Sequence, residues 1–294
     1  SVMNWRTTPE HDAREVARAS EELGADATII DHYRVNAEYQ KHLLASGIRW
    51  MQFDWNARQP LWADWVLNAS PAADEDVYQS LQQREETVLL LGPLHAMLRQ
   101  DFARWRPRVR FREDVRSILL TFGGGDDRGA TVFFLEALRP LEPSVERVVL
   151  ASSANPRLSD LREWVDGNND SNVTLLVDDR HLAKRMAEAD LAITAGGTTT
   201  FETAAMGVPS LIVQLEKNQR PNAEAWQRLG VANDMGQLGS LGSDCLLQQT
   251  LELLNNSGLR RSMSCAGRSH VDCLGTRRVS QVLLTEDVEN VERN

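Results

Sequence analysis

A strand-like run that ends in two glycines carries the clearest chemical signal in this chain of 294 residues. Residues 191–194 are apolar enough for a buried strand, and residues 195–202 read AGGTTTFE. Glycines let a backbone approach a phosphate closely, and hydroxyls together with the first N–H groups of a helix donate to an anion. Glu202 lies about one helical turn further on, where a carboxylate can accept hydrogen bonds from a ribose diol.

We therefore predict a nucleotide site at this turn, with a ribose contact at Glu202 and phosphate contacts at Gly196, Gly197, Thr198 and Thr199. The bare pattern fits a second interpretation equally well. A plain helix after a strand can be capped by Thr198 or Thr199, with Glu202 completing a capping box.

Amide side chains follow the next strand-like run, residues 210–213. Ligands of open α/β sheets bind beyond the carboxyl ends of the strands. Asn218, Gln219 and Asn222 carry the donors and acceptors that fix a sugar or a phosphate. Capping of the following helix by Asn218 or Asn222 is the alternative that the spacing leaves open.

A third candidate is a glycine-rich loop, residues 122–128, of sequence FGGGDDR. It has neither the Gly-Lys-Ser/Thr of a P-loop nor the spacing of a dinucleotide fingerprint. Three glycines after a strand predict that a ligand approaches the backbone at Gly124 and Gly125, and a tight turn is the alternative. Asp126 would hold the loop or orient a ligand hydroxyl.

Two polar segments follow strand-like runs in the first third of the chain: residues 31–33 (DHY) and Asp54. In a parallel sheet both would face the same edge. His32 and Tyr33 are candidates for acid–base chemistry or substrate binding. A structural role at the end of a strand is the alternative.

Short apolar runs alternate with helical patterns along the chain, which is typical of α/β proteins with parallel sheets. We predict two Rossmann-type domains, residues 1–110 and 111–294, with an arginine-rich linker at 103–115. Strands are predicted at residues 27–30, 50–53, 65–67 and 88–91, and then at 117–121, 148–151, 173–177, 191–194 and 210–213. The first domain opens on a helix rather than a strand, so we expect it to be incomplete.

The amino-acid composition argues against several classes of binding partner. The net charge is −10, and no run of Lys or Arg provides a footprint for nucleic acid or for an anionic membrane. Three cysteines, none of them in a CxxC pair, argue against a disulfide framework and against a zinc site. No apolar run reaches the ~18–20 residues of a membrane span, and the first residues do not resemble a signal peptide. We therefore expect a cytoplasmic protein with a small-molecule ligand, without a metal or another cofactor.

Taken in order, these segments resemble the PseG-like UDP-sugar hydrolases of pseudaminic acid biosynthesis, which are relatives of the glycosyltransferase MurG. The resemblance begins near Asp26 and is strongest over residues 186–223. It rests on segments 30–33, 53–54, 91–93, 122–126, 172–174, 189–193, 195–199, 207–210, 218–219 and 222–223.

The resemblance implies a GT-B fold, with two Rossmann-type domains and UDP on the second. By this resemblance, residues 196–199 would meet the diphosphate, Glu202 the ribose, and Gln219 and Asn222 the diphosphate or sugar. Val177 would lie near the uracil, and Tyr33 would serve the active site. The family removes UDP from UDP-2,4-diacetamido-2,4,6-trideoxy-β-L-altropyranose, with water as acceptor and without a metal.

One departure from the family pattern affects the expected activity. The family opens with a strand and a Gly-x-Gly-His loop, whose histidine is the expected general base, whereas the first histidine here is His11 in the sequence PEHD. Two alternatives therefore accompany the hydrolase: a UDP-sugar-dependent GT-B glycosyltransferase, and a non-catalytic module that binds a nucleotide sugar. An exposed edge of a partial sheet would also be compatible with a homodimer.

Overall fold

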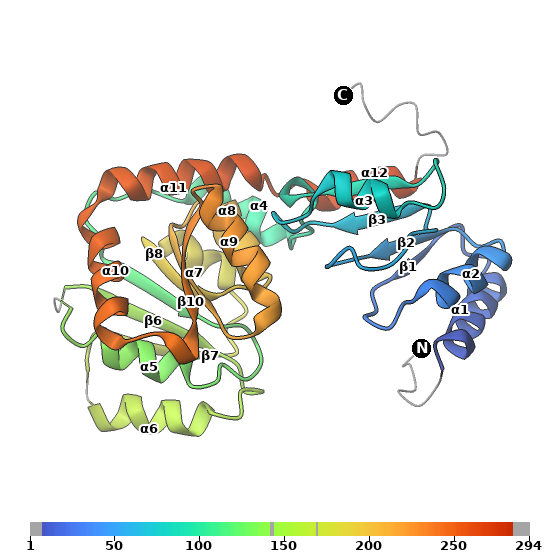
Figure 1. Ribbon diagram of the computed structural model, residues 1–294. Helices are drawn as coiled ribbons and strands as arrows, with labels where there is room; N and C mark the ends of the chain where they lie inside the picture. The colour runs from blue at the N-terminus through green and yellow to red at the C-terminus, as the bar shows by residue number, and fades with distance from the viewer. Residues whose placement is uncertain (1–7, 142–143, 169, 285–294) are drawn as a thin grey trace. The chain divides into compact units, whose positions relative to one another are not determined.

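The computed structural model describes residues 8–141, 144–168 and 170–284, which form two compact units (Figure 1). Of the described residues, those up to Met97 and those from Gly275 onward make up the first unit. Leu98–Leu274 make up the second. Each unit is built around its own parallel sheet.

The sheet of the first unit has four strands in the order β1-β2-β3-β4. They are β1 (Thr28–Ile30), β2 (Trp50–Phe53), β3 (Trp65–Asn68) and β4 (Val88–Leu91). Successive side chains alternate between the two faces, so Trp50 and Val66 enter one core while Met51, Trp65 and Leu67 enter another. The described part of this unit does open on a helix, as predicted.

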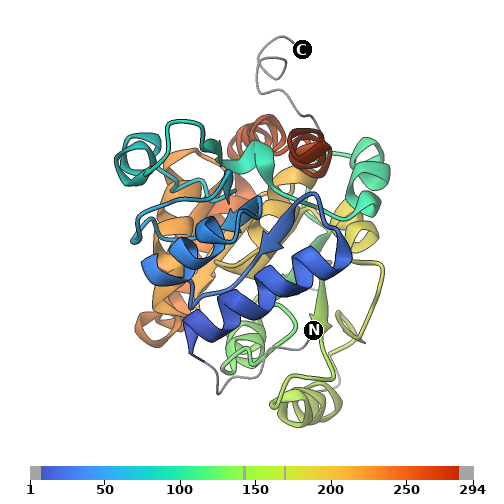
Figure 2. The same cartoon turned by 90° about the vertical axis from the view of Figure 1, so that its right-hand side faces the viewer.

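Four α-helices cover this sheet: α1 (Pro9–Leu23), α2 (Ala37–Ala45), α3 (Glu75–Leu81) and α12 (Gly275–Leu284). Helices α1 and α2 pack against each other, as Figures 1 and 2 show. Thr8, Asn36 and Asp74 cap the first three helices by accepting backbone N–H groups of the first turn. Helix α12 buries Val279 and Val282 against Met51 and Leu67.

The second unit has six parallel strands in the order β10-β9-β8-β5-β6-β7. They are β5 (Ser117–Thr121), β6 (Glu146–Ala151), β7 (Val173–Val177), β8 (Leu191–Ala195), β9 (Ser210–Gln214) and β10 (Ala232–Gln237). The five strands predicted between residues 117 and 213 are all present, as β5 to β9, and β10 is a sixth strand that was not predicted. Its sequence, ANDMGQ, is mostly polar, which an edge strand tolerates because only part of it faces the core.

Helices cover both faces of this second sheet (Figure 1). The core of one face includes α5 (Ala130–Ala137), α6 (Leu158–Asn168) and α10 (Ser243–Asn255). The core of the other includes α4 (Gln100–Trp105), α7 (Leu182–Glu188) and α8 (Thr199–Met206). The remaining helices are α9 (Arg220–Arg228), which contacts β9 and β10, and α11 (Ser257–His270), which packs on α8.

The arginine-rich segment predicted as a linker lies inside the second unit. Phe102 of α4 is fully buried beside Met186. The Arg106 guanidinium donates to carbonyl oxygens at the ends of α8 and α11, and Arg112 forms an ion pair with Asp190 at 2.8 Å. These arginines thus form hydrogen bonds and an ion pair within the second unit. The boundary between the two units lies before this segment, after Met97.

The last helix also departs from the predicted division, because α12 returns to the first unit. Within the residues that the structure describes, no helix is both long enough and apolar enough to span a bilayer.

Candidate functional site

The turn between β8 and α8 is shaped by close packing at one glycine and by open space at the next. The Gly196 N–H donates to the Val213 carbonyl at 3.2 Å and to Gln219 Oε1 at 3.3 Å. A Cβ on Gly196 would lie 2.9 Å from the Cβ of Gln219, so a larger residue does not fit there. A Cβ on Gly197 would meet no atom within 4 Å. The backbone at Gly197 is therefore open to a ligand.

Of the three threonines of this turn, Thr200 makes side-chain hydrogen bonds that hold the turn, whereas Thr198 and Thr199 make none among the described residues. Thr200 is buried; its hydroxyl donates to the Gly197 carbonyl at 2.7 Å and accepts from the Asn222 and Trp226 side chains. Thr198, at the start of α8, is exposed and makes no capping bond through its side chain. The capping box considered as an alternative is thus not formed.

Glu202 is a carboxyl group that is largely desolvated by burial. No hydrogen bond or ion pair to it occurs among the described residues. Burial raises its pKa to about 7, and the positive charge of Arg99 only partly opposes this. A carboxyl group held in this way is stabilised when donors such as the two hydroxyls of a diol reach it. Strongly perturbed groups of this kind are common at functional sites.

The side-chain amides predicted to bind a ligand lie at the turn, and two of them make hydrogen bonds to its backbone. Gln219 Oε1 accepts the N–H groups of both Gly196 and Leu215, the latter at 2.9 Å. Asn222 Nδ2 donates to the Gly196 carbonyl at 2.9 Å. Asn218 is exposed on the same loop. Helix α9 has no side-chain cap, so the alternative role of Asn218 or Asn222 as a cap is not observed.

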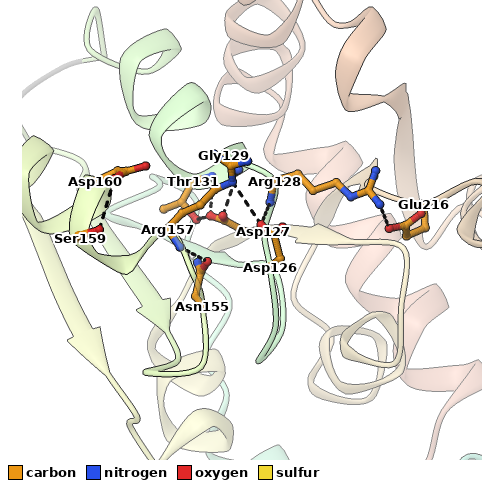
Figure 3. A network of polar contacts seen from close by, with 10 residues as sticks. All are labelled: Asp126, Asp127, Arg128, Gly129, Thr131, Asn155, Arg157, Ser159, Asp160 and Glu216. Carbon is orange, nitrogen blue, oxygen red and sulfur yellow. Dashed lines mark hydrogen bonds and ion pairs between the residues drawn. The ribbon is translucent and has the colours of Figure 1, made fainter.

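The glycine-rich loop after β5 is open and is held by its two aspartates (Figure 3). Cβ atoms placed on Gly124 and Gly125 would meet nothing within 4 Å. Asp126 Oδ1 accepts the Arg128 N–H at 2.8 Å and lies 3.3 Å from Arg157 Nε. Asp127 is buried and accepts N–H groups from the first turn of α5. Of the two predicted roles of Asp126, holding the loop is the one observed.

An ion pair links this loop to the loop after β9. Arg128, whose φ is 55°, pairs with Glu216, and both side chains are about half exposed (Figure 3). The two residues lie 88 positions apart, and no local sequence signal connects them. The pair places one positive and one negative charge beside the Gly196 turn.

Val177 ends β7 at the edge of the sheet opposite to β10. The next residue, Asp178, has φ 55°, donates its N–H to the Ala151 carbonyl at 2.9 Å and accepts from the Ser153 N–H at 2.9 Å. The Ser153 backbone bond lowers the pKa of the Asp178 carboxyl group below its ordinary value. These bonds fix the backbone after Val177 at the carboxyl edge that also holds Gly196.

The candidate site residues of the first unit differ in exposure and in hydrogen bonding. Tyr33 is 80% exposed, and its ring packs edge-on against that of Trp55, with ring centroids 5.5 Å apart. Asp54 is occupied: it accepts the N–H groups of Asn56 and Ala57 and the hydroxyl of the buried Tyr78. These bonds give Asp54 a structural role at the end of β2. His32 Nδ1 accepts the N–H of Arg34 at 3.1 Å.

Among the described residues, no group of three or more His, Cys, Asp or Glu side chains is arranged to hold a metal ion.

Comparison with known proteins gives matches to both the sequence and the fold. Residues 141–272 match the model of the glycosyltransferase family 28 C-terminal domain. The chain is 27% identical over 232 residues to the spore coat polysaccharide biosynthesis protein SpsG of Bacillus subtilis, covering 78% of this chain and 66% of that protein. It is 24% identical over 216 residues to the uncharacterized protein MJ1062 of Methanocaldococcus jannaschii, covering 71% and 44%. The matches thus span less than two thirds of either relative.

Solved structures with the same fold include Acinetobacter baumannii MurG, with a TM-score of 0.67 at 20% identity over 94% of this chain and 78% of that one. The Staphylococcus aureus MnaA–UDP co-structure has a TM-score of 0.65 at 14% identity and covers 95% and 82%. A putative UDP-N-acetylglucosamine 2-epimerase from Listeria monocytogenes has a TM-score of 0.66 at 15% identity and covers 96% and 81%. The chain therefore has the α/β fold of GT-B structures such as MurG, as predicted, and most of its second unit matches the family 28 C-terminal domain.

Proposed function

We propose that this protein binds a UDP-sugar at the carboxyl edge of the second sheet and releases UDP from it by hydrolysis. The observation that carries the proposal is Glu202, a desolvated carboxyl group about one helical turn from the open backbone at Gly197, to which no described residue makes a hydrogen bond or an ion pair. A ribose diol would supply the donors that Glu202 lacks. The diphosphate would meet the N–H groups at the start of α8, where the helix dipole favours negative charge.

The proposed substrate is the one implied by the family resemblance, UDP-2,4-diacetamido-2,4,6-trideoxy-β-L-altropyranose. A water oxygen would bond to the anomeric carbon while the bond from that carbon to the phosphate oxygen breaks. The electron pair of this bond leaves with UDP, and a base takes the proton of the water. The N–H groups around Gly197, Thr198 and Thr199 would stabilise the negative charge that develops on the diphosphate. Tyr33 is the residue of the first unit that we propose for the active site.

The comparisons support nucleotide binding in general more than this substrate in particular. The MnaA structure contains UDP, and structures of Anabaena HepE with a similar fold contain UDP or UDP-glucose. The family 28 match over residues 141–272 also favours a second candidate, transfer of the sugar to an acceptor other than water. A binding module without turnover is the third.

Two measurements test the proposal. Calorimetry with UDP and UMP should detect binding, and Glu202→Ala should weaken UDP binding by at least about tenfold, because a hydrogen bond to a charged group contributes about 1.5–3 kcal/mol. No binding of UDP at millimolar concentration would refute the nucleotide site. Incubation of the altropyranose substrate in H₂¹⁸O, followed by NMR and mass spectrometry, should release UDP and place the label on the sugar. Tight UDP binding without release in water would instead favour the transferase or the binding module.

A further inference from the structure

Trp226 is a buried residue of α9 whose indole N–H reaches the turn between β8 and α8. Its Nε1 donates to Thr200 Oγ1 at 2.9 Å, and none of its surface is exposed. Its ring packs edge-on against that of Phe201, with ring centroids 5.4 Å apart. Because it is buried, Trp226 can affect a ligand at the turn only through the residues that it contacts.

The hydroxyl group of Thr200 has a partner for each of its hydrogen-bonding positions. A threonine hydroxyl offers one donor and two acceptor positions. The acceptor positions are taken by Trp226 Nε1 at 2.9 Å and by Asn222 Nδ2 at 3.1 Å. Both of these nitrogens are donors only, so neither can accept the hydroxyl proton. The proton is therefore directed to the carbonyl oxygen of Gly197, which lies 2.7 Å away.

Two successive carbonyl groups of the turn are held by the protein in this way. The Gly197 carbonyl accepts from the hydroxyl and the N–H of Thr200, at 2.7 and 3.2 Å. The Gly196 carbonyl accepts from Asn222 Nδ2 at 2.9 Å. The C=O and N–H of a trans peptide point in opposite directions, and none of the described peptides is cis. The N–H groups of Gly197 and Thr198 therefore point away from these partners, and no described residue accepts them.

This arrangement needs support because one of its residues is a glycine. Without a Cβ, Gly197 can adopt backbone conformations that other residues rarely adopt, so the peptide between Gly197 and Thr198 can rotate when its carbonyl is not held. After such a rotation, a carbonyl oxygen would face a bound anion in place of an N–H group. The hydrogen bond from the Thr200 hydroxyl opposes this rotation, and Trp226 fixes the direction of that bond.

We propose that Trp226 is a positioning residue for the diphosphate. Its indole N–H orients the Thr200 hydroxyl, which holds the Gly197 carbonyl and so keeps the Thr198 N–H directed at the diphosphate. The effect of Trp226 should therefore appear in the affinity for a ligand that carries phosphate and not in the affinity for a nucleoside. The proposal rests on the proposed function, since it needs the diphosphate of a UDP-sugar at the turn.

Calorimetry with UDP and NMR titration with uridine, which lacks phosphate, test this role. Trp226→Phe removes the indole N–H and keeps an aromatic ring beside Phe201. It should weaken UDP binding at least about fivefold, as expected for the loss of one hydrogen bond, and change uridine binding less than about twofold. Trp164→Phe is the matched control, because Trp164 is also buried and its indole N–H donates to Glu136, but it lies on α6. The control should bind UDP as tightly as the unaltered protein.

Variants of Thr200 show whether Trp226 acts through the hydroxyl group. Thr200→Val removes the hydroxyl and should weaken UDP binding at least as much as Trp226→Phe does. Adding Trp226→Phe to Thr200→Val should then cause no further loss of UDP affinity, because coupled residues are not additive. Thr200→Ser keeps the hydroxyl and should bind UDP within about twofold of the unaltered protein.

The outcomes separate the two proposals. Failure of the unaltered protein to bind UDP would refute the nucleotide site and the role of Trp226 together. If the unaltered protein binds UDP and Trp226→Phe binds it as tightly as the control does, the role of Trp226 is overturned while the nucleotide site stands. Equal losses of UDP and uridine affinity, or losses that add in the double variant, would also overturn it, because they indicate a general loosening of the fold. Urea unfolding identifies the folded variants. If Trp226→Phe does not fold, unchanged UDP affinity in Thr200→Val would overturn the proposal.

Discussion

Gln219 and Gly196 are fitted to each other: the amide oxygen of Gln219 accepts the Gly196 N–H at 3.3 Å, and its Cβ lies 2.9 Å from where a Cβ of Gly196 would be. The same oxygen accepts the N–H of Leu215. The loops after β8 and β9 are therefore joined at one atom. Gln219, a residue predicted to touch the ligand, also shapes the backbone of the turn predicted to bind it.

Because of this close packing, alanine substitution of two adjacent glycines should affect the stability of the protein differently. Gly196→Ala should destabilise the protein by about 1–3 kcal/mol, since the added methyl group overpacks against Gln219. It should also weaken UDP binding because the turn shifts. Gly197→Ala places its methyl group in open space, so stability should stay within about 1 kcal/mol while UDP binding falls. Urea unfolding and calorimetry measure the two effects.

Gly167→Ala serves as a control for Gly197→Ala, because a Cβ there also meets nothing within 4 Å and Gly167 lies on α6, away from the turn. It should leave UDP binding unchanged. If Gly197→Ala binds UDP as tightly as the control does, the ligand does not approach the backbone at Gly197.

The contrast between β9 and β10 shows which parts of the fold could be predicted. Strands such as β9 are buried on both faces and read as continuous apolar runs, which sequence patterns identify well. Strand β10 lies at the edge, and the carboxylate of its polar Asp234 accepts the Gly236 N–H and orients Gln214 of β9. That relationship joins residues 20 positions apart, and neither segment signals it alone.

The same reasoning applies to the site. The turn at residues 196–202 was predictable, because its glycines, hydroxyls and carboxylate are consecutive. The roles of Gln219 and Asn222 were not, since their partners at Gly196 depend on how two loops meet. The pair of Arg128 with Glu216 and the orientation of Gln214 likewise depend on the assembled sheet.

The raised pKa of Glu202 predicts a pH dependence of nucleotide binding. A carboxylate accepts hydrogen bonds from a diol better than the protonated acid does, so bound ribose favours the ionised form. With a pKa of about 7, the ionised fraction rises from about 9% at pH 6 to about 91% at pH 8. UDP should therefore bind about tenfold more tightly at pH 8 than at pH 6, as calorimetry can measure. Glu202→Gln should lose this component and keep only the dependence due to the phosphate, which both proteins share.

The same shift has a consequence for stability without ligand. The pKa of Glu202 is higher in the folded protein than its ordinary value of 4.5, so the folded state holds this proton more tightly than the unfolded state does. The contribution of Glu202 to stability is thus favourable at low pH and is lost as pH rises from about 4.5 to about 7, by up to about 3 kcal/mol. Glu202→Gln should flatten this part of the profile in urea unfolding. An identical slope in both proteins would contradict the shift.

The ion pair between Arg128 and Glu216 should contribute little to stability. Both side chains are about half exposed, so Glu216→Gln should cost less than about 1 kcal/mol. Arg128 has φ 55°, a left-handed backbone conformation that is about 1–2 kcal/mol less favourable for a residue with a Cβ atom than for glycine. Arg128→Gly should therefore be more stable than Arg128→Ala by about 1 kcal/mol in urea unfolding, although both lose the ion pair. A less stable glycine variant would show that the backbone is not strained there.

Loss of the hydroxyl group should lower the unfolding free energy at one tyrosine of the first unit and leave it nearly unchanged at another. Tyr78→Phe leaves buried Asn68 and the Asp54 carboxylate without a shared partner, and should lower the unfolding free energy by about 1–3 kcal/mol. Tyr33→Phe changes an exposed side chain, so its stability should stay within about 0.5 kcal/mol. If Tyr33 serves the proposed hydrolysis, Tyr33→Phe should lower the rate of UDP release while the affinity for UDP stays the same. An unchanged rate would remove Tyr33 from the active site.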